Sequence, residues 1–198
     1  MDDLVRQAMA KWPNVPHCYG WLGLDARGNW YMRDDKAQAA GPFAGVDGGT
    51  PTSRGSRLQH DKLVNFIQRN YGHDDQGQWF FQNGPQRVYV ELEATPYIWR
   101  VSETLDVSSH AGQAVTVRDC LLDESGWVYL ECLCDGEAVL GLVHTQDVGW
   151  VAEAIAQGRW TPRDVSRAEL PGRYGYMRSP AATRAQVQTQ PAQATQHP

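Results

Sequence analysis

Three cysteines and one histidine in the second half of the chain have the chemistry of a zinc site. Cys132 and Cys134 form a Cys-x-Cys pair, with Cys120 before it and His144 after it. Thiolate and imidazole are the ligands that zinc prefers. On a strand, however, Cys132 and Cys134 share one face with Leu130, which favours small apolar residues of a core. We therefore predict no metal site.

Three further sets of reactive residues are better explained by local structure. His17 and Cys18 are adjacent, so on an extended segment they point apart and are poorly aligned as base and nucleophile. The Gly-rich stretch 48–56 precedes a predicted helix, where anions bind backbone amides, but it lacks the Gly-Lys-Ser/Thr ending of a phosphate loop. His73 and the two aspartates after it lie in a turn, where Asp commonly binds local backbone. We predict no catalytic residue and no cofactor.

The segment 87–93 alternates between apolar and polar residues and predicts a strand with one buried and one wet face. Val88, Val90 and Leu92 form the buried set. Tyr, Trp and Arg are the residue types that anchor interfaces. The predicted binding residues, on the wet face and in the next segment, are Arg87, Tyr89, Glu91, Trp99 and Arg100. The alternative is that Trp99 belongs to the core and the others are ordinary solvated positions.

Composition limits the partners that the chain can have. The 198 residues include 18 basic and 23 acidic side chains, with a net charge of −5 and no basic block, so we expect no nucleic-acid binding. The start Met1-Asp2-Asp3 lacks the basic region of a secretory signal. No stretch of about 18 apolar residues predicts a membrane span. We expect a soluble cytoplasmic protein with reduced thiols.

The elements that must position these residues follow from local patterns. Helical spacing of apolar residues predicts helices over 2–12, 58–71 and 146–157, and Thr161-Pro162 predicts the start of a short one. Ser56 and Gln59 have the spacing of a capping box for the second helix. Alternation and turn residues predict hairpins over 18–33, 78–93 and 128–143, and further strands over 97–101 and 115–120.

These elements divide the chain into five segments. They are an N-terminal helix and hairpin (1–33), a flexible Gly-rich loop (34–56), two α+β units (57–104 and 105–178) and a disordered tail (179–198). The loop is assigned as flexible because its composition offers little apolar surface to bury.

An Asp-x-x-Gly turn followed by Trp occurs three times, beginning at Asp25, Asp74 and Asp123. Equal spacing of a turn and an aromatic strand predicts one supersecondary unit used more than once. The alternative is that Asp and Gly are common in the turns of unrelated hairpins.

Several runs of the sequence are similar to those of a known family. They are Gly28-Asn29-Trp30, Leu63-Val64-Asn65-Phe66, Gly77-Gln78-Trp79 and the segment 85–96. Over residues 20–155 the chain resembles a bacterial domain-of-unknown-function family built from repeated α+β motifs. The resemblance implies a two-repeat fold and a part in signalling, and it supplies no catalytic residues.

We therefore expect an α+β fold, with antiparallel hairpins in one or two small sheets and helices packed on them. The favoured function is a noncatalytic binding or regulatory module for a protein partner or a small ligand. The alternative is a small hydrolase-like enzyme with a pocket between the repeats. In that enzyme, His73, Asp74 and the 34–56 loop would line one cleft, with the loop as a lid.

Overall fold

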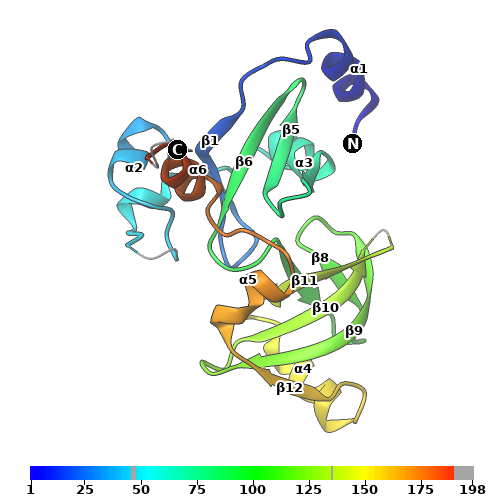
Figure 1. Cartoon of the computed structure of the whole chain (residues 1–198). Coiled ribbons are helices and arrows are strands. Elements are labelled where there is room, and N and C mark those ends of the chain that lie inside the picture. Colours follow the sequence, from blue (N-terminus) through cyan, green and yellow to red (C-terminus); the bar gives the residue numbers. More distant parts are fainter. Residues whose placement is uncertain (46–47, 135, 190–198) are drawn as a thin grey trace, which may run out of the picture.

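A computed structural model describes residues 1–45, 48–134 and 136–189 of the chain. The described residues form two six-stranded sheets, which segment 93–96 joins, together with helices packed against them (Figure 1). The predicted α+β class is confirmed. The strand over 97–101 belongs to the second sheet, although the predicted unit 57–104 placed it with the first.

The first sheet is mixed, with the strand order β3-β2-β1-β6-β5-β4. The predicted hairpins β1–β2 and β5–β6 are present, and β1 and β6 run parallel between them, although only antiparallel pairing was expected. The strands are β1 (Cys18–Leu24), β2 (Trp30–Met32), β3 (Ser56–Arg57), β4 (Tyr71–His73), β5 (Trp79–Asn83) and β6 (Gln86–Leu92).

Both faces of β6 are covered, although the sequence predicted one wet face. Val90 and Leu92 pack in the core with Ile67 of helix α3 (Asp61–Arg69), as expected. On the opposite face Tyr89 and Glu91 are only 3% and 1% exposed. Helix α6 (Pro180–Thr189) packs there against β6 and β1 (Figure 1). The predicted alternation is therefore correct, but the polar side is dry because the C-terminal helix returns to it.

The second sheet closes into a five-stranded barrel, because β10 pairs with β9 as well as with β11. Its strands are β7 (Tyr97–Val101), β8 (Val107–Ser109), β9 (Ala114–Asp123), β10 (Val128–Cys134) and β11 (Glu137–Val143), with β12 (Pro162–Val165) added on β9. Helix α4 (Val148–Ala156) contributes Val151 to the barrel core. The predicted burial of Cys132 and Cys134 is confirmed.

The three Asp-x-x-Gly sequences form the same turn. In each turn one carboxylate oxygen accepts the backbone N–H groups two and four residues later, at 2.8–3.0 Å. The glycine has a φ of +79° at Gly28, +72° at Gly77 and +79° at Gly126, a conformation that glycine adopts without steric cost. The turns belong to an open sheet in two cases and to the barrel in the third. The repeated feature that the structure confirms is the turn, and a repeated fold is not confirmed.

Two predicted helices begin later than expected. Helix α1 (Asp3–Lys11) agrees with the prediction, whereas α3 begins at Asp61. Ser56 cannot cap α3, because it pairs with Met32 in the sheet, and the His60 imidazole instead accepts the Leu63 N–H at 3.4 Å. Helix α4 likewise begins at Val148 and has no side-chain cap.

Segment 34–56 contains regular structure where a loop was predicted. It holds helix α2 (Asp35–Ala39), the 3-10 helix η1 (Thr52–Arg54) and the first residue of β3. The buried guanidinium of Arg33 donates to the carbonyls of Gly20, Gly41 and Ser53, and these bonds organise the segment. Sequence composition could not reveal that Arg33 organises the segment. The flexibility of the segment stays a prediction.

The C-terminal region differs most from expectation. Residues after Thr161 form edge strand β12, which runs parallel to β9, in place of the predicted helix. The 3-10 helix η2 (Arg167–Glu169) and helix α5 (Leu170–Arg173) follow. Part of the predicted disordered tail is helix α6, and residues 190–198 lie outside the described residues.

Within the described ranges, no helix combines the length and the apolar character that crossing a membrane requires.

Candidate functional site

The five predicted binding residues do not form one exposed surface. The Tyr89 ring stacks on Tyr19 with centroids 4.4 Å apart, and the Arg87 guanidinium lies 4.4 Å from the Phe80 ring centroid. Trp99 is 0% exposed, and its indole N–H donates to the carbonyl of Leu130 inside the barrel at 2.8 Å. The alternative reading of Trp99 as a core residue is correct.

Glu91 holds helix α6 on the first sheet. Its carboxylate accepts the Ser179 hydroxyl at 2.5 Å and the Ala181 backbone N–H at 3.1 Å, at the start of the helix. Burial raises the pKa of Glu91, although these hydrogen bonds oppose that shift. The predicted contact residue is therefore a buried cap.

Arg100 has an exposed side chain but an internal partner. Its Nε donates to Asp147 Oδ2 at 2.5 Å, and Asp147 also accepts the Val101 N–H at 3.1 Å. The pair connects β7 to the residue before helix α4. This arrangement gives Arg100 a structural partner, and its use in binding stays a prediction.

The cysteines occupy apolar surroundings. Burial raises the pKa of Cys120 to about 11 and that of Cys132 to about 12, so both remain thiols at neutral pH. The His144 ring accepts the Gln146 N–H through Nδ1 at 3.2 Å. In the part of the chain that the structure describes, no three His, Cys, Asp or Glu residues form a group that could hold a metal.

His73 and Asp74 have separate surroundings. One Asp74 oxygen accepts the two turn N–H groups, and the other accepts the Tyr89 hydroxyl at 3.1 Å. His73 Nε2 lies 3.2 Å from Glu137 Oε2, across the two sheets. His73 lines a cavity there, whereas neither Asp74 nor segment 34–56 is among the described residues that line it. Of the three features expected to line the hydrolase cleft, His73 lines this cavity, whereas Asp74 and the described residues of the 34–56 segment do not.

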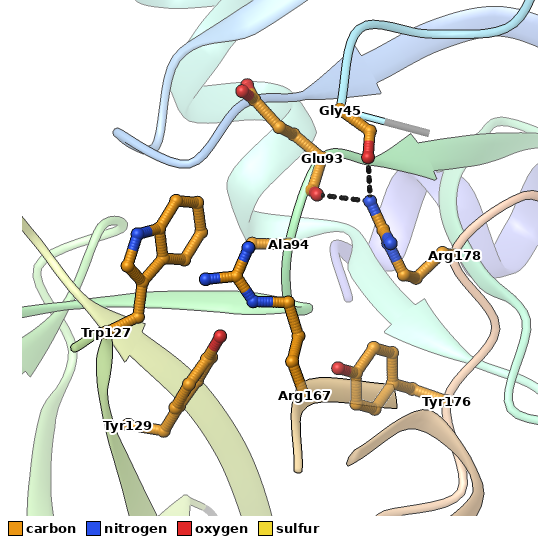
Figure 2. Close-up of a pocket in the computed structure, with 8 residues that line it drawn as sticks. All are labelled: Gly45, Glu93, Ala94, Trp127, Tyr129, Arg167, Tyr176 and Arg178. Carbon is orange, nitrogen blue, oxygen red and sulfur yellow. Dashed lines mark hydrogen bonds between the residues drawn. The ribbon is translucent and has the colours of Figure 1, made fainter. Parts of the chain in front are cut away.

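A different cavity, of about 120 Å³, lies where the two sheets meet (Figure 2). Gly45 and the Glu93-Ala94 segment border it from the side of the first sheet, and Trp127 and Tyr129 from the barrel. The C-terminal region closes it. The lining residues are Gly45, Glu93, Ala94, Trp127, Tyr129, Arg167, Tyr176 and Arg178.

The third Asp-x-x-Gly turn positions the first cation of this cavity. Asp123 is 0% exposed at its side chain, and its Oδ2 accepts Arg167 Nε at 2.8 Å and the Tyr129 hydroxyl at 2.9 Å. Burial opposes ionisation of Asp123, but the bonds from Arg167, from the turn backbone and from Tyr129 outweigh it and lower its pKa. Asp123 is therefore a carboxylate that holds Arg167 in place.

The Arg167 guanidinium lies over the ring of Trp127. Its guanidinium carbon is 4.0 Å from the Trp127 ring centroid, a cation–π contact. Its Nη2 is buried and has no hydrogen-bond partner among the described residues. The hydrogen-bonding capacity of Arg167 Nη2 is therefore unsatisfied by the described residues.

Arg178 is the second cation. Its Nη2 donates to the backbone carbonyls of Glu93, at 2.7 Å, and of Gly45 (Figure 2). Its Nε is buried without a partner, and Arg178 forms no ion pair with any described residue. The Glu93 carboxylate instead pairs with Arg54 at 3.2 Å. The positive charge of Arg178 is therefore uncompensated.

The arrangement can bind an anion. Arg167, Arg178 and Glu93 line the cavity; Arg167 pairs with Asp123 behind it and Glu93 pairs with Arg54, so the charge of Arg178 has no ion-pair partner among the described residues. Burying a polar group without a hydrogen-bond partner costs folding free energy, and burying a charged group without one costs more. An anionic group that accepted from Arg167 Nη2 and Arg178 Nε would satisfy both. Aromatic rings of Trp127, Tyr129 and Tyr176 supply the remaining walls.

Comparison with protein families identifies the chain. A family model described as "Protein of unknown function (DUF2946)" matches residues 1–181. The chain belongs to this family. The family resemblance expected from the sequence, to a domain of unknown function, is confirmed. No curated protein matches the chain significantly.

Two solved structures are similar to this member of the family. A DUF1285 family protein from Silicibacter pomeroyi DSS-3 has a TM-score of 0.44 and 11% identity, covering 77% of this chain and 84% of that one. A DUF1285 family protein from Shewanella baltica OS155 has a TM-score of 0.42 and 17% identity, covering 67% of this chain and 91% of that one.

Proposed function

We propose that this protein is a noncatalytic binding module whose cavity between the two sheets takes the anionic group of a small ligand. The observation that supports the proposal best is Arg178, a cation with a buried unpaired Nε and no counter-ion among the described residues. In carboxylate and phosphate recognition, charge-assisted hydrogen bonds from guanidinium groups are stronger than hydrogen bonds between neutral groups.

The size of the cavity limits what enters it. Its volume of about 120 Å³ is well below the roughly 300–1,000 Å³ of sites that enclose a drug-sized molecule. It therefore suits one carboxylate or phosphate group, with the rest of the ligand outside it. Because the lining residues come from both sheets and from the C-terminal region, the bound group would bridge parts of the chain that are distant in sequence.

The proposal is tested by titrating inorganic phosphate, and separately acetate, into the full chain and following amide resonances by NMR. Arg178→Gln removes the unpaired charge and should weaken binding about tenfold to a hundredfold, the equivalent of a lost charge-assisted hydrogen bond. The matched control is Arg118→Gln, at an exposed position on β9 that does not line the cavity. This control should bind like the wild type.

Two results would overturn the proposal. One is a wild-type chain that binds neither anion at millimolar concentration. The other is equal affinity of the wild type, Arg178→Gln and Arg118→Gln, because binding would then lie elsewhere. Arg167→Gln provides a second variant, since it removes the other unpaired N–H group.

A further inference from the structure

A second cavity lies at the same junction. Its volume is about 270 Å³, and its apolar and aromatic residues include Trp79 and Pro96 on one side and Leu140 and Tyr174 on the other. His73 and Glu137 also line it, and their side chains are 40% and 71% exposed. The second cavity is therefore mixed, with an apolar part at Trp79 and Leu140 and a polar part at the Tyr174 hydroxyl and at the His73–Glu137 pair, which reaches solvent.

Tyr176 belongs to both cavities. Its side chain lines the anion cavity and also the second one, and it is largely buried. The segment that joins the sheets borders them as well, with Ala94 on the first cavity and Pro96 on the second. The two spaces are thus neighbours along one junction and share Tyr176 as part of their walls.

The Tyr176 ring is not anchored by its hydroxyl. The backbone on either side is fixed, because Tyr176 N donates to Pro171 O at 3.0 Å and Met177 N donates to Gly77 O at 2.9 Å. The hydroxyl itself forms no hydrogen bond with any described residue. The ring packs in the hydrophobic core, so a ligand that spanned both cavities would have to displace it to another side-chain rotamer.

We infer that the ligand is an amphipathic monoanion, with its anionic group at Arg167 and Arg178 and an apolar body that passes Tyr176 into the second cavity. This inference rests on the proposed function and adds the chemical class of the ligand. Apolar surface removed from water against Trp79 and Leu140 adds affinity that a bare anion lacks. The Glu137 carboxylate disfavours a second negative charge at the far end.

The test compares acetate with 3-phenylpropionate, which has the same carboxylate and an added benzyl group. The wild type should bind 3-phenylpropionate at least about tenfold more tightly, because burial of one aromatic ring supplies that much. Ala138→Trp, at an exposed position that lines the second cavity, should remove most of this gain and leave acetate binding unchanged. Ala114→Trp, the same change at an exposed position of β9, is the control and should retain the tighter binding of 3-phenylpropionate.

A second measurement needs no substitution. Trp127 lies on the first cavity and Trp79 on the second, so their indole NMR signals report on each separately. Acetate should shift the Trp127 signal alone, whereas 3-phenylpropionate should shift both.

The outcomes separate the two proposals. Equal affinity for both carboxylates, or a Trp79 signal that stays fixed while 3-phenylpropionate binds, overturns this inference and leaves the anion site intact. An unchanged gain in Ala138→Trp also overturns it. Failure of both carboxylates and of phosphate to bind removes the proposed function itself.

Discussion

The guanidinium of Arg167 lies over the indole of Trp127, 4.0 Å from the ring centroid, while its Nε donates to Asp123 at 2.8 Å. Asp123 begins the third Asp-x-x-Gly turn, and Trp127 directly follows its glycine. A turn that is recognisable in the sequence therefore positions Arg167, the first residue of η2, an element that the sequence did not predict.

The charge of Asp123 should matter more than the charge of its counterpart in the second turn. Asp123→Asn keeps an oxygen that can accept the turn N–H groups. It removes the negative charge that pairs with Arg167. We expect a loss of about 1.5–3 kcal/mol in the free energy of unfolding. Asp74→Asn, which loses no ion pair with any described residue, should cost less than about 1 kcal/mol. Urea denaturation measures both, and equal losses would contradict the role of Arg167.

Stability should fall with acid because of His110. Burial lowers the pKa of His110 to about 4, and its Nδ1 accepts the Ile98 N–H at 3.3 Å. The unfolded chain, with a histidine pKa of about 6.5, binds the proton first, so stability is lost as the pH falls from about 6.5 to about 4.

The loss attributable to His110 should reach up to about 3 kcal/mol, since one pKa unit is 1.36 kcal/mol. Urea denaturation between pH 7 and pH 4 measures it, with His110→Gln as the control. The variant should lose less stability over this range than the wild type. Parallel curves for the two proteins would show that His110 does not titrate in this way.

Gly141 leaves room for the indole of Trp99. A Cβ at Gly141 would lie 2.4 Å from Trp99 Nε1 and 2.8 Å from the Tyr97 carbonyl oxygen. Gly141→Ala should therefore destabilise the barrel by at least about 2 kcal/mol. Gly149→Ala, in helix α4 with open space around the position, should be neutral or stabilising by up to about 1 kcal/mol. Thermal unfolding of the two variants distinguishes them, and similar melting temperatures would refute the steric argument.

Glu91 should control the docking of α6. Glu91→Ala removes the acceptor of the Ser179 hydroxyl and the Ala181 N–H, so amides of 182–186 should exchange with deuterium at least about tenfold faster. Ser179→Ala removes one of the two bonds and should have a smaller effect. Unchanged exchange in Glu91→Ala would mean that packing on β6 and β1 alone holds the helix.

Local patterns predicted the elements that are stabilised by their own neighbours in sequence. The β5–β6 and β10–β11 hairpins, and the burial of Val90, Leu92 and Cys132, follow from alternation and turn residues alone. The opposite face of β6 could not be predicted in this way. Its cover depends on Ser179 and Ala181, 88 and 90 residues after Glu91.

The cavity was missed for the same reason. Arg167 meets Asp123 across 44 residues, and Arg178 meets Glu93 across 85. Neither arginine is part of a recognisable motif, and the residues after Thr161 predicted a short helix where the structure has β12. The repeated Asp-x-x-Gly turn was the one available signal, but only the third copy carries a guanidinium on its second carboxylate oxygen.

The most direct test of the anion site is the Nε–H NMR signal of Arg178, followed while inorganic phosphate is added to the full chain. If the unpaired Nε donates to a bound anion, this signal should shift and saturate together with that of Arg167, while the signal of Arg118 stays fixed. A fixed Arg178 signal at phosphate concentrations that saturate binding elsewhere would show that the junction cavity is not where the anion binds.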